Sequence, residues 1–155
     1  MAKAETPAAL AKVKSFVDTG QFQAVQAAAV AALESWEQFL PRNLKVFTER
    51  RDAAVKAFCE AGFTCEAPKA TMYLWIPLPD SVKSAAFAER LMEDEGVIVL
   101  PGSGFGAGGE GFFRISFITS PARIAEAATR AGRVLRSILA GEGQAKKSRQ
   151  PAGAA

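Results

Sequence analysis

The spacing of apolar residues alternates along the chain between a helical and a strand period. Apolar residues recur every three to four positions in segments that predict helices at about residues 6–18, 21–34, 42–61, 82–95 and 120–139. Short apolar or alternating runs predict strands at about residues 63–66, 72–76, 97–100 and 112–118. We therefore expect an α+β fold: a small, mostly antiparallel sheet with packed helices, preceded by two further helices.

The expected helix ends depend on proline, glycine and capping residues. Pro41 is expected to open the third helix, because proline suits the first helical turn. Asp80 or Ser81 is expected to cap the fourth helix with its side-chain oxygen. The last helix should end at about Leu139 and the ordered part of the chain at Gly141, and the small and polar residues 141–155 predict a disordered tail.

The predicted helix at residues 21–34 consists almost entirely of small and apolar residues, with the sequence FQAVQAAAVAAL over residues 22–33. A helix that is apolar on nearly all sides needs to be buried on most of them. An ordinary core helix would meet this need, but a chain of 155 residues offers little core to surround it. We predict instead that protein outside this chain covers the helix.

A glycine-rich loop joins the last two predicted strands. Gly104, Gly106 and Gly109 match the pattern G-x-G-x-x-G, which indicates a dinucleotide site only where it follows a strand and opens a helix. The residues that follow, 112–118, alternate as a strand does, so we reject the dinucleotide interpretation. The glycines suit an active-site loop or merely a tight connection.

One arginine lies inside the last predicted strand. Phe113, Ile115 and Phe117 alternate onto one face, which places Arg114 on the other. A guanidinium keeps its charge, and burying it without a partner is costly. Its planar fork matches a carboxylate in a bidentate geometry. A structural ion pair and an anion-binding role are both compatible with the residues alone.

Composition limits the remaining possibilities. The chain has 155 residues and a net charge of +3, which is too small to indicate a nucleic-acid partner. No apolar run reaches the roughly 18 residues needed to span a membrane, and the start lacks the features of a signal peptide. The absence of histidine excludes Ser-His and Cys-His nucleophile systems and histidine metal ligands. Cys59 and Cys65 lack a metal-binding spacing, so we expect reduced thiols and a cytoplasmic protein.

Three segments resemble the C-terminal third of class I/II aminotransferases, the fold type I enzymes that use pyridoxal phosphate. They are KSFVDTGQFQAVQAAAVAAL at residues 14–33, ATMYLWIPLP at residues 70–79, and LPGSGFGAGGEGFFRIS at residues 100–116. The wording of these motifs is most similar to the alanine, aspartate and diaminopimelate subgroup. The resemblance implies that residues 1–34 end the large cofactor-binding domain and that residues 35–140 form the small domain.

The resemblance also implies roles for particular residues. The arginine of the family's F-R-I-S strand grips the α-carboxylate of the substrate, and here it is Arg114. Gly102 and Gly104 would belong to the loop that borders the substrate. Gln23 would lie near the cofactor phosphate of a partner subunit, so a homodimer or another homo-oligomer is implied. Ala70 departs from the family's usual glycine before T-M-Y-L-W, which puts the fine shape of the substrate side in question.

The family's catalytic lysine has no counterpart in this chain, because no segment matches the family's S-x-x-K motif. The resemblance implies amino-group transfer between an amino acid and a 2-oxo acid, with pyridoxal phosphate as cofactor. We expect the isolated chain to be a C-terminal part of such an enzyme and to be inactive alone. The alternative is a non-catalytic module of the same fold that binds amino acids or completes a partner polypeptide.

Overall fold

The computed structural model describes residues 5–18 and 20–148. The chain divides into two units, residues 1–43 and residues 44–155, which are described separately below. The division falls inside one long helix, whereas the sequence predicted a boundary between residues 34 and 35. The assignment of residues 1–34 to a large domain stays a prediction.

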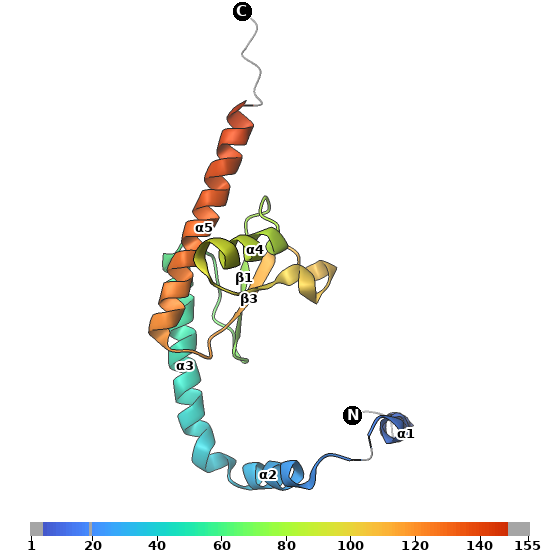
Figure 1. Ribbon diagram of the computed structural model, residues 1–155. Helices are drawn as coiled ribbons and strands as arrows, with labels where there is room; N and C mark the ends of the chain where they lie inside the picture. Colours follow the sequence, from blue (N-terminus) through green and yellow to red (C-terminus); the bar gives the residue numbers. More distant parts are fainter. Residues whose placement is uncertain (1–4, 19, 149–155) are drawn as a thin grey trace, which may run out of the picture. The chain divides into compact units, whose positions relative to one another are not determined.

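The first unit contains helices α1 (Glu5–Val17) and α2 (Gln23–Glu34) and the start of α3 (Trp36–Glu60) (Figure 1). The predicted helices at residues 6–18 and 21–34 are confirmed to within two residues at each end. No residue of α2 is buried. Large apolar side chains lie exposed on both α1 and α2 or just before α2: Leu10, Val13, Phe16, Val17, Phe22, Val25, Val30 and Leu33.

The start of α3 differs from the prediction. Pro41 lies inside the helix, which begins at Trp36. Proline has no backbone N–H, so the hydrogen bond from residue 41 to the carbonyl of Glu37 is missing. This missing bond lies close to the start of the helix. The loss of one hydrogen bond at this position leaves the neighbouring turns helical, so Pro41 does not mark the first turn.

The second unit contains a three-stranded sheet in the order β1-β3-β2, with both pairs antiparallel. The strands are β1 (Tyr73–Pro77), β2 (Leu100–Pro101) and β3 (Phe112–Ser116). The small antiparallel sheet expected from the sequence is confirmed, as are the strands at residues 72–76 and 112–118 to within two residues. The strand predicted at residues 97–100 is wrong except at Leu100, which begins the two-residue strand β2.

Two apolar segments that were predicted as strands, residues 63–66 and the start of residues 97–100, form connections that pack against helices instead. Residues 63–66 form no strand in the described structure, because Phe63 bonds through its N–H to the carbonyl of Phe58 and enters the core from a turn. Val97 likewise donates its N–H to the carbonyl of Leu91 and helps to end a helix. Apolar composition indicates burial in both places, but it does not distinguish a strand from a buried connection.

Two more helices pack in the second unit: α4 (Ser84–Glu95) and α5 (Pro121–Ser148). Gly96 ends α4 in the left-handed conformation, with φ of 65°. The predicted end of the last helix at about Leu139 is wrong, because α5 continues through Gly141 to Ser148; an interior glycine costs only about 1 kcal/mol relative to alanine. Residues 149–155 of the predicted tail lie outside the described residues. None of the described helices is long and apolar enough to cross a membrane.

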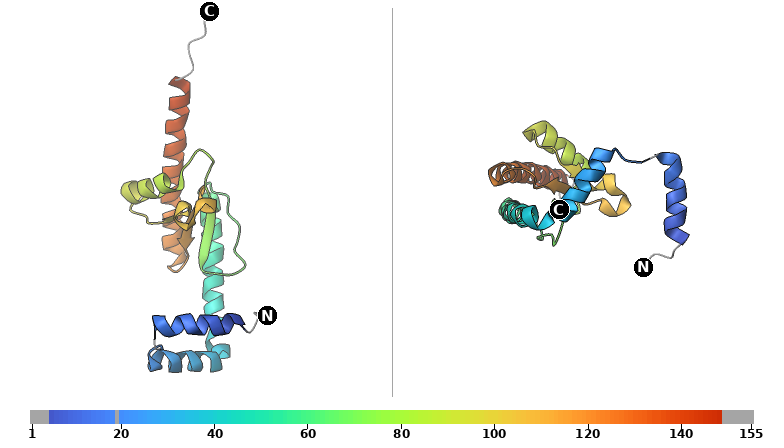
Figure 2. Two further views of the ribbon diagram at one scale, coloured as in Figure 1. Left: turned by 90° about the vertical axis from the view of Figure 1, so that its right-hand side faces the viewer. Right: turned by 90° about the horizontal axis from the view of Figure 1, so that it is seen from below.

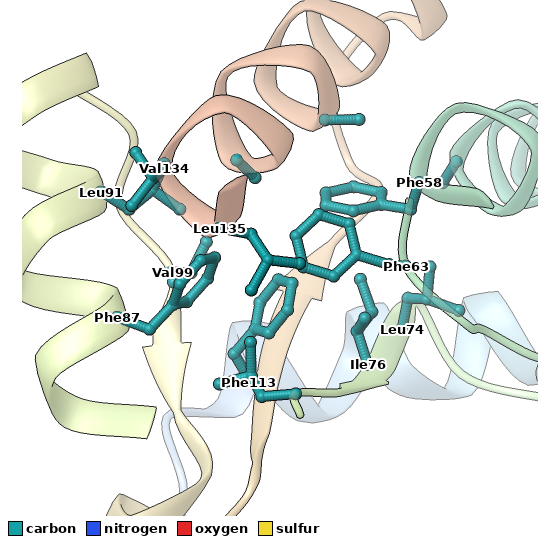
Figure 3. Packing of buried hydrophobic residues seen from close by; sticks show 14 of the residues in the cluster. Phe58, Phe63, Leu74, Ile76, Phe87, Leu91, Val99, Phe113, Val134 and Leu135 are labelled. Carbon is teal, nitrogen blue, oxygen red and sulfur yellow. The ribbon is translucent and has the colours of Figure 1, made fainter. Parts of the chain in front are cut away.

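One face of the sheet carries the core. The C-terminal part of α3, together with α4 and α5, covers this face, and α4 and α5 lie side by side (Figures 1 and 2). Four phenylalanine rings meet at the centre with centroid distances of 5.0 to 6.1 Å (Figure 3). These rings belong to Phe58, Phe63, Phe87 and Phe113. Aliphatic side chains surround them, among them Leu74, Ile76, Leu91, Val99, Val134 and Leu135.

Candidate functional site

Arg114 occupies the middle of the sheet, on the face opposite the core. Its neighbours in β3 alternate as predicted: Phe113 is fully buried in the core, whereas Arg114 is half-buried on the other side. In the register of the sheet, Arg114 pairs with Trp75 of β1 and with Leu100 of β2. A strand on each side therefore holds the backbone of Arg114 in place.

Aromatic rings surround the guanidinium group. The Cζ atom of Arg114 lies 4.0 Å from the ring centroid of Tyr73 and 4.5 Å from that of Phe105. Trp75 packs edge-on to Phe105 and stacks on Phe112, each with centroids 5.5 Å apart. The rings supply cation–π attraction but no hydrogen-bond acceptor in the guanidinium plane.

The described residues supply no acidic partner for Arg114. Neither an ion pair nor a hydrogen bond from its guanidinium is present within residues 5–18 and 20–148. The structural ion pair considered from the sequence is therefore not formed in this part of the chain. The five N–H donors of the guanidinium are available to an anion.

A cavity of about 250 Å³ opens beside Arg114. Its lining includes two cationic residues, Arg114 and Arg123, and three residues that carry a hydroxyl group, Tyr73, Ser116 and Thr119. The rest of the lining is apolar: Phe58, Val97, Ile98, Val99, Leu100, Ile115, Ile124, Ala127 and Ala131. A cavity of this kind suits a small anionic molecule that also has an apolar part.

Two glycines of the predicted substrate loop have different roles. Gly102 and Gly109 approach each other so closely that a Cβ atom on either would overlap the carbonyl oxygen of the other. This contact folds residues 102–109 into the short 3₁₀ turns η1 (Gly102–Phe105) and η2 (Ala107–Gly109), and η1 carries Phe105 to Arg114. A Cβ atom on Gly104 would meet nothing within 4 Å. Gly102 therefore determines the shape of the loop, whereas Gly104 is free of this constraint.

Glu110 fixes the loop to the start of α4. Its carboxylate accepts hydrogen bonds from the backbone N–H of Ser84 at 2.9 Å, the hydroxyl of Ser84 at 3.3 Å and the backbone N–H of Gly111 at 3.1 Å. The buried Ser84 hydroxyl also accepts the backbone N–H of Ser103 at 3.2 Å. The bonds from Ser84 and Gly111 hold the pKa of Glu110 below its usual value.

The cap of α4 corrects the prediction that Asp80 or Ser81 would provide it. The N-cap residue is Lys83, whose side chain makes no capping hydrogen bond, and the carboxylate of Glu110, 26 residues after Ser84, caps the helix instead. Glu110 was visible in the sequence as the single acidic residue of the glycine loop, although nothing in its spacing indicated α4 as its partner.

The turn before β1 contains a strained residue that sequence reasoning missed. Thr71 has φ of 78°, a left-handed conformation that is unfavourable for a β-branched residue. Such a conformation costs on the order of 1–3 kcal/mol. Ala70, the departure noted in the sequence, lies exposed just before it. The carbonyl of Met72, the next residue, accepts the N–H of Phe117 at 3.0 Å, next to the end of β3.

Gln23, the remaining candidate, is the exposed first residue of α2 in the first unit. Its expected place near a cofactor phosphate stays a prediction. The structure brings Arg114, Gly102 and the glycine loop together within the second unit, and the aromatic neighbours Tyr73, Trp75 and Phe105 are the additions that the sequence did not single out.

Solved structures of aminotransferases share this fold. The alpha-aminoadipate aminotransferase of Thermus thermophilus, complexed with N-(5'-phosphopyridoxyl)-L-leucine, matches 90% of this chain and 38% of its own length, with a TM-score of 0.79 and 27% identity. A probable N-succinyldiaminopimelate aminotransferase from another strain of the same species matches 84% of this chain and 35% of its own length, with a TM-score of 0.76 and 35% identity. The fold thus defines the class as pyridoxal-phosphate-dependent aminotransferases.

The family follows from the sequence comparison. Residues 1–130 match the family described as Aminotransferase class I and II, and the chain belongs to this family. The LL-diaminopimelate aminotransferase of Moorella thermoacetica is 46% identical over 136 residues, which are 88% of this chain and 35% of that enzyme. The LL-diaminopimelate aminotransferase 2 of Nostoc sp. is 42% identical over 121 residues, 78% of this chain and 31% of that enzyme. The chain thus spans about a third of these relatives, and the resemblance found in its motifs is confirmed.

Pyridoxal phosphate is the cofactor of the family and of its structural neighbours. The enzymes hold it through a lysine, but no lysine lines the cavity beside Arg114 within the described residues.

Proposed function

We propose that this chain supplies the carboxylate-binding part of an amino acid aminotransferase, with Arg114 as the ligand of the substrate α-carboxylate. The observation that supports this role is that the half-buried Arg114 lines a cavity and that its guanidinium has no acidic partner among the described residues. A carboxylate would restore the missing partner with two parallel hydrogen bonds.

The rings of Tyr73 and Phe105 would orient this interaction. They lie against the guanidinium at 4.0 and 4.5 Å and restrict the side chain before any ligand arrives. An arginine that is already restricted loses less side-chain entropy on binding. The apolar walls of the cavity would exclude water around the ion pair and so strengthen it.

The reaction that we propose for the complete enzyme is transfer of an amino group between an amino acid and a 2-oxo acid. Several similar enzymes are named LL-diaminopimelate aminotransferases, so we propose diaminopimelate as the first amino donor to test. Pyridoxal phosphate supplies the electron sink for this chemistry when it is bound. Arg114 would hold the carboxylate end of the substrate while the rest of the enzyme supplies the lysine.

We further propose that the isolated chain is inactive and works as part of a homodimer. No S-x-x-K segment is present in its sequence. The exposed apolar side chains of α1 and α2 indicate a surface that other protein covers. The unbridged thiols of Cys59 and Cys65 fit a reducing compartment, so we propose a cytoplasmic location.

Complementation tests the proposal. The chain is co-expressed with the part of the Moorella enzyme that precedes its matched region, and formation of the keto acid from diaminopimelate is followed with pyridoxal phosphate present. We expect activity from the pair and none from the chain alone. We expect Arg114→Ala to lower kcat/KM by roughly 10- to 100-fold, the loss of a charge-assisted bidentate interaction.

Arg90→Ala is the matched control, because Arg90 pairs with Asp94 on the surface of α4 and does not line the cavity. Full activity of Arg114→Ala, or a loss of the same size in Arg90→Ala, would contradict the role of Arg114. An inactive wild-type pair that folds and associates would contradict the aminotransferase proposal itself.

A non-catalytic amino-acid-binding module is the second candidate. It is favoured by the observation that Arg114, its aromatic neighbours and the cavity all lie within residues 44–155. Calorimetry on the chain alone, without cofactor, distinguishes the two candidates. Binding of an amino acid that disappears in Arg114→Ala supports the module, whereas no binding supports the aminotransferase part.

A further inference from the structure

The thiols of Cys59 and Cys65 lie next to each other at the end of α3, in the second unit. The Sγ atoms of Cys59 and Cys65 lie 3.3 Å apart, and both cysteines are free. A disulfide has a sulfur–sulfur distance of about 2.05 Å, so the two atoms need to approach by little more than an ångström. The two residues come from the end of α3 and from the connection that follows it.

Buried neighbours hold both thiols in place. Cys59 follows the buried Phe58, and Cys65 lies two residues after the buried Phe63. The rings of Phe58 and Phe63 pack edge-to-face with centroids 5.7 Å apart (Figure 3). The N–H of Phe63 bonds to the carbonyl of Phe58 at 3.0 Å, which closes the turn between the cysteines.

The two thiols differ in accessibility. Cys59 is exposed, whereas Cys65 is half-buried and its thiol donates to the carbonyl of Val55 at 3.5 Å. Burial, together with the neighbouring Cys59 thiol, raises the pKa of Cys65 to about 12. Cys59 is thus the group that a reagent from solvent meets first.

We propose that Cys59 and Cys65 form a dithiol modification site that low-molecular-weight disulfides oxidise to an intramolecular disulfide. The Cys59 thiolate attacks one sulfur of the small disulfide RSSR, forms a mixed disulfide and releases RS⁻. The Cys65 sulfur then loses its proton and attacks the Cys59 sulfur, displacing the second RS⁻. Two protein thiols are oxidised, one RSSR is reduced to two RSH, and the two protons from the cysteines end on the released thiols.

The site would control the stiffness of the connection between α3 and β1. An intramolecular disulfide would close the short turn that carries Phe63 into the core, and cross-linking of this kind reduces the freedom of the unfolded chain. We expect the oxidised chain to unfold at a Tm higher by roughly 5–10 °C.

The experiment treats the full chain, at low protein concentration, with oxidised glutathione as the probe. Intact mass measurement and peptide mapping then identify the modified cysteines. We expect the wild-type chain to lose two hydrogen atoms, to have no alkylatable thiol and to contain one Cys59–Cys65 disulfide. We expect Cys65→Ser to stop at a stable glutathione adduct on Cys59. Cys59→Ser should stay largely unmodified, because the remaining thiol is half-buried.

A wild-type chain that keeps glutathione on Cys59, carries an adduct on both cysteines, or forms disulfides only between chains would overturn the proposal. An unchanged Tm after oxidation would overturn the stabilising role. Cys65→Ala serves as a second variant, so that a folding defect in Cys65→Ser, detected by circular dichroism, does not decide the result.

Discussion

The carboxylate of Glu110 accepts the backbone N–H of Ser84 at 2.9 Å and so caps α4 from within the glycine loop. The same carboxylate accepts the N–H of Gly111, next to the start of β3. One side chain therefore connects the beginning of a helix, the loop that carries Phe105, and the strand that carries Arg114. The position of the aromatic ring against Arg114 depends on this connection.

Replacing Glu110 should loosen the loop and lower stability. In Glu110→Ala the backbone N–H of Ser84 loses its acceptor, and loss of a helix cap typically lowers the Tm of a domain of this size by several degrees, roughly 3–8 °C. Thermal unfolding measures this change. Glu89→Ala is the matched control, because Glu89 is an exposed glutamate in α4 that makes no ion pair or side-chain hydrogen bond among the described residues. Equal Tm values for the two variants would contradict the capping role.

The cap should also depend on pH. Hydrogen bonds from Ser84 and Gly111 hold the folded-state pKa of Glu110 below that of the unfolded chain. Its contribution to stability is then fully present above the unfolded pKa, about 4.3, and is lost as the pH falls through the lower folded pKa. We expect the Tm difference between wild type and Glu110→Gln to be constant near neutral pH and to shrink below about pH 4.

The comparison of wild type with Glu110→Gln separates the pH dependence of the Glu110 cap from that of a second carboxylate, Glu95. Arg133 lowers the pKa of Glu95 chiefly through a hydrogen bond, so Glu95 loses its contribution over a similar acidic range. Because Glu95 is present in both proteins, it cancels in the difference. A Tm difference that stays unchanged down to strongly acidic pH would show that the charge of Glu110 does not matter.

The two glycines of the loop should respond differently to alanine. Gly102→Ala places a Cβ atom against the carbonyl of Gly109 and 2.7 Å from the carbonyl oxygen of Phe112, both rigid backbone groups. We expect a loss of about 1–3 kcal/mol in the free energy of unfolding, the usual cost of overpacking. Gly104→Ala, whose Cβ atom meets nothing within 4 Å, is the matched control and should be nearly neutral. Urea denaturation measures both, and equal effects would mean that the loop does not require this close approach.

We expect the aromatic ring of Tyr73 to contribute to substrate binding, and its hydroxyl group not to contribute. Tyr73→Leu removes the ring that lies 4.0 Å from the Cζ atom of Arg114, and we expect KM of the complemented enzyme to rise by roughly 3- to 10-fold. Tyr73→Phe keeps the ring and should leave KM almost unchanged. A rise of the same size in Tyr73→Phe would assign the effect to the hydroxyl group instead.

The exposed apolar side chains of the first unit should make the isolated chain associate. Val25, Val30 and Leu33 of α2 are all more than half exposed. Contacts between such surfaces remove apolar area from water, so light scattering should detect oligomers or aggregates that grow with concentration. The triple variant Val25→Gln, Val30→Gln, Leu33→Gln should reduce this association. A wild-type chain that stays monomeric at high concentration would contradict the expectation.

Local sequence determined much of this protein. The 3.6-residue period located the five α-helices of the described residues, although α3 starts earlier than predicted, and the alternation of Phe113, Arg114 and Ile115 correctly put the arginine on the face opposite the core. Both patterns depend only on residues close together in the chain, because helix and strand geometry decide by themselves which side chains share a face. The three motifs at residues 14–33, 70–79 and 100–116 identified the family, because each is a run of neighbouring residues.

Tertiary structure decided what depends on distant segments. The cap of α4 comes from Glu110, the glycine loop folds through a contact between Gly102 and Gly109, and the aromatic rings meet Arg114 from β1 and η1. Of the strand predicted at residues 97–100, only Leu100 pairs with β3, whereas the N–H of Val97 is bonded to the end of α4. A backbone or side-chain group binds the partner that packing brings within reach, and spacing along the chain does not specify that partner.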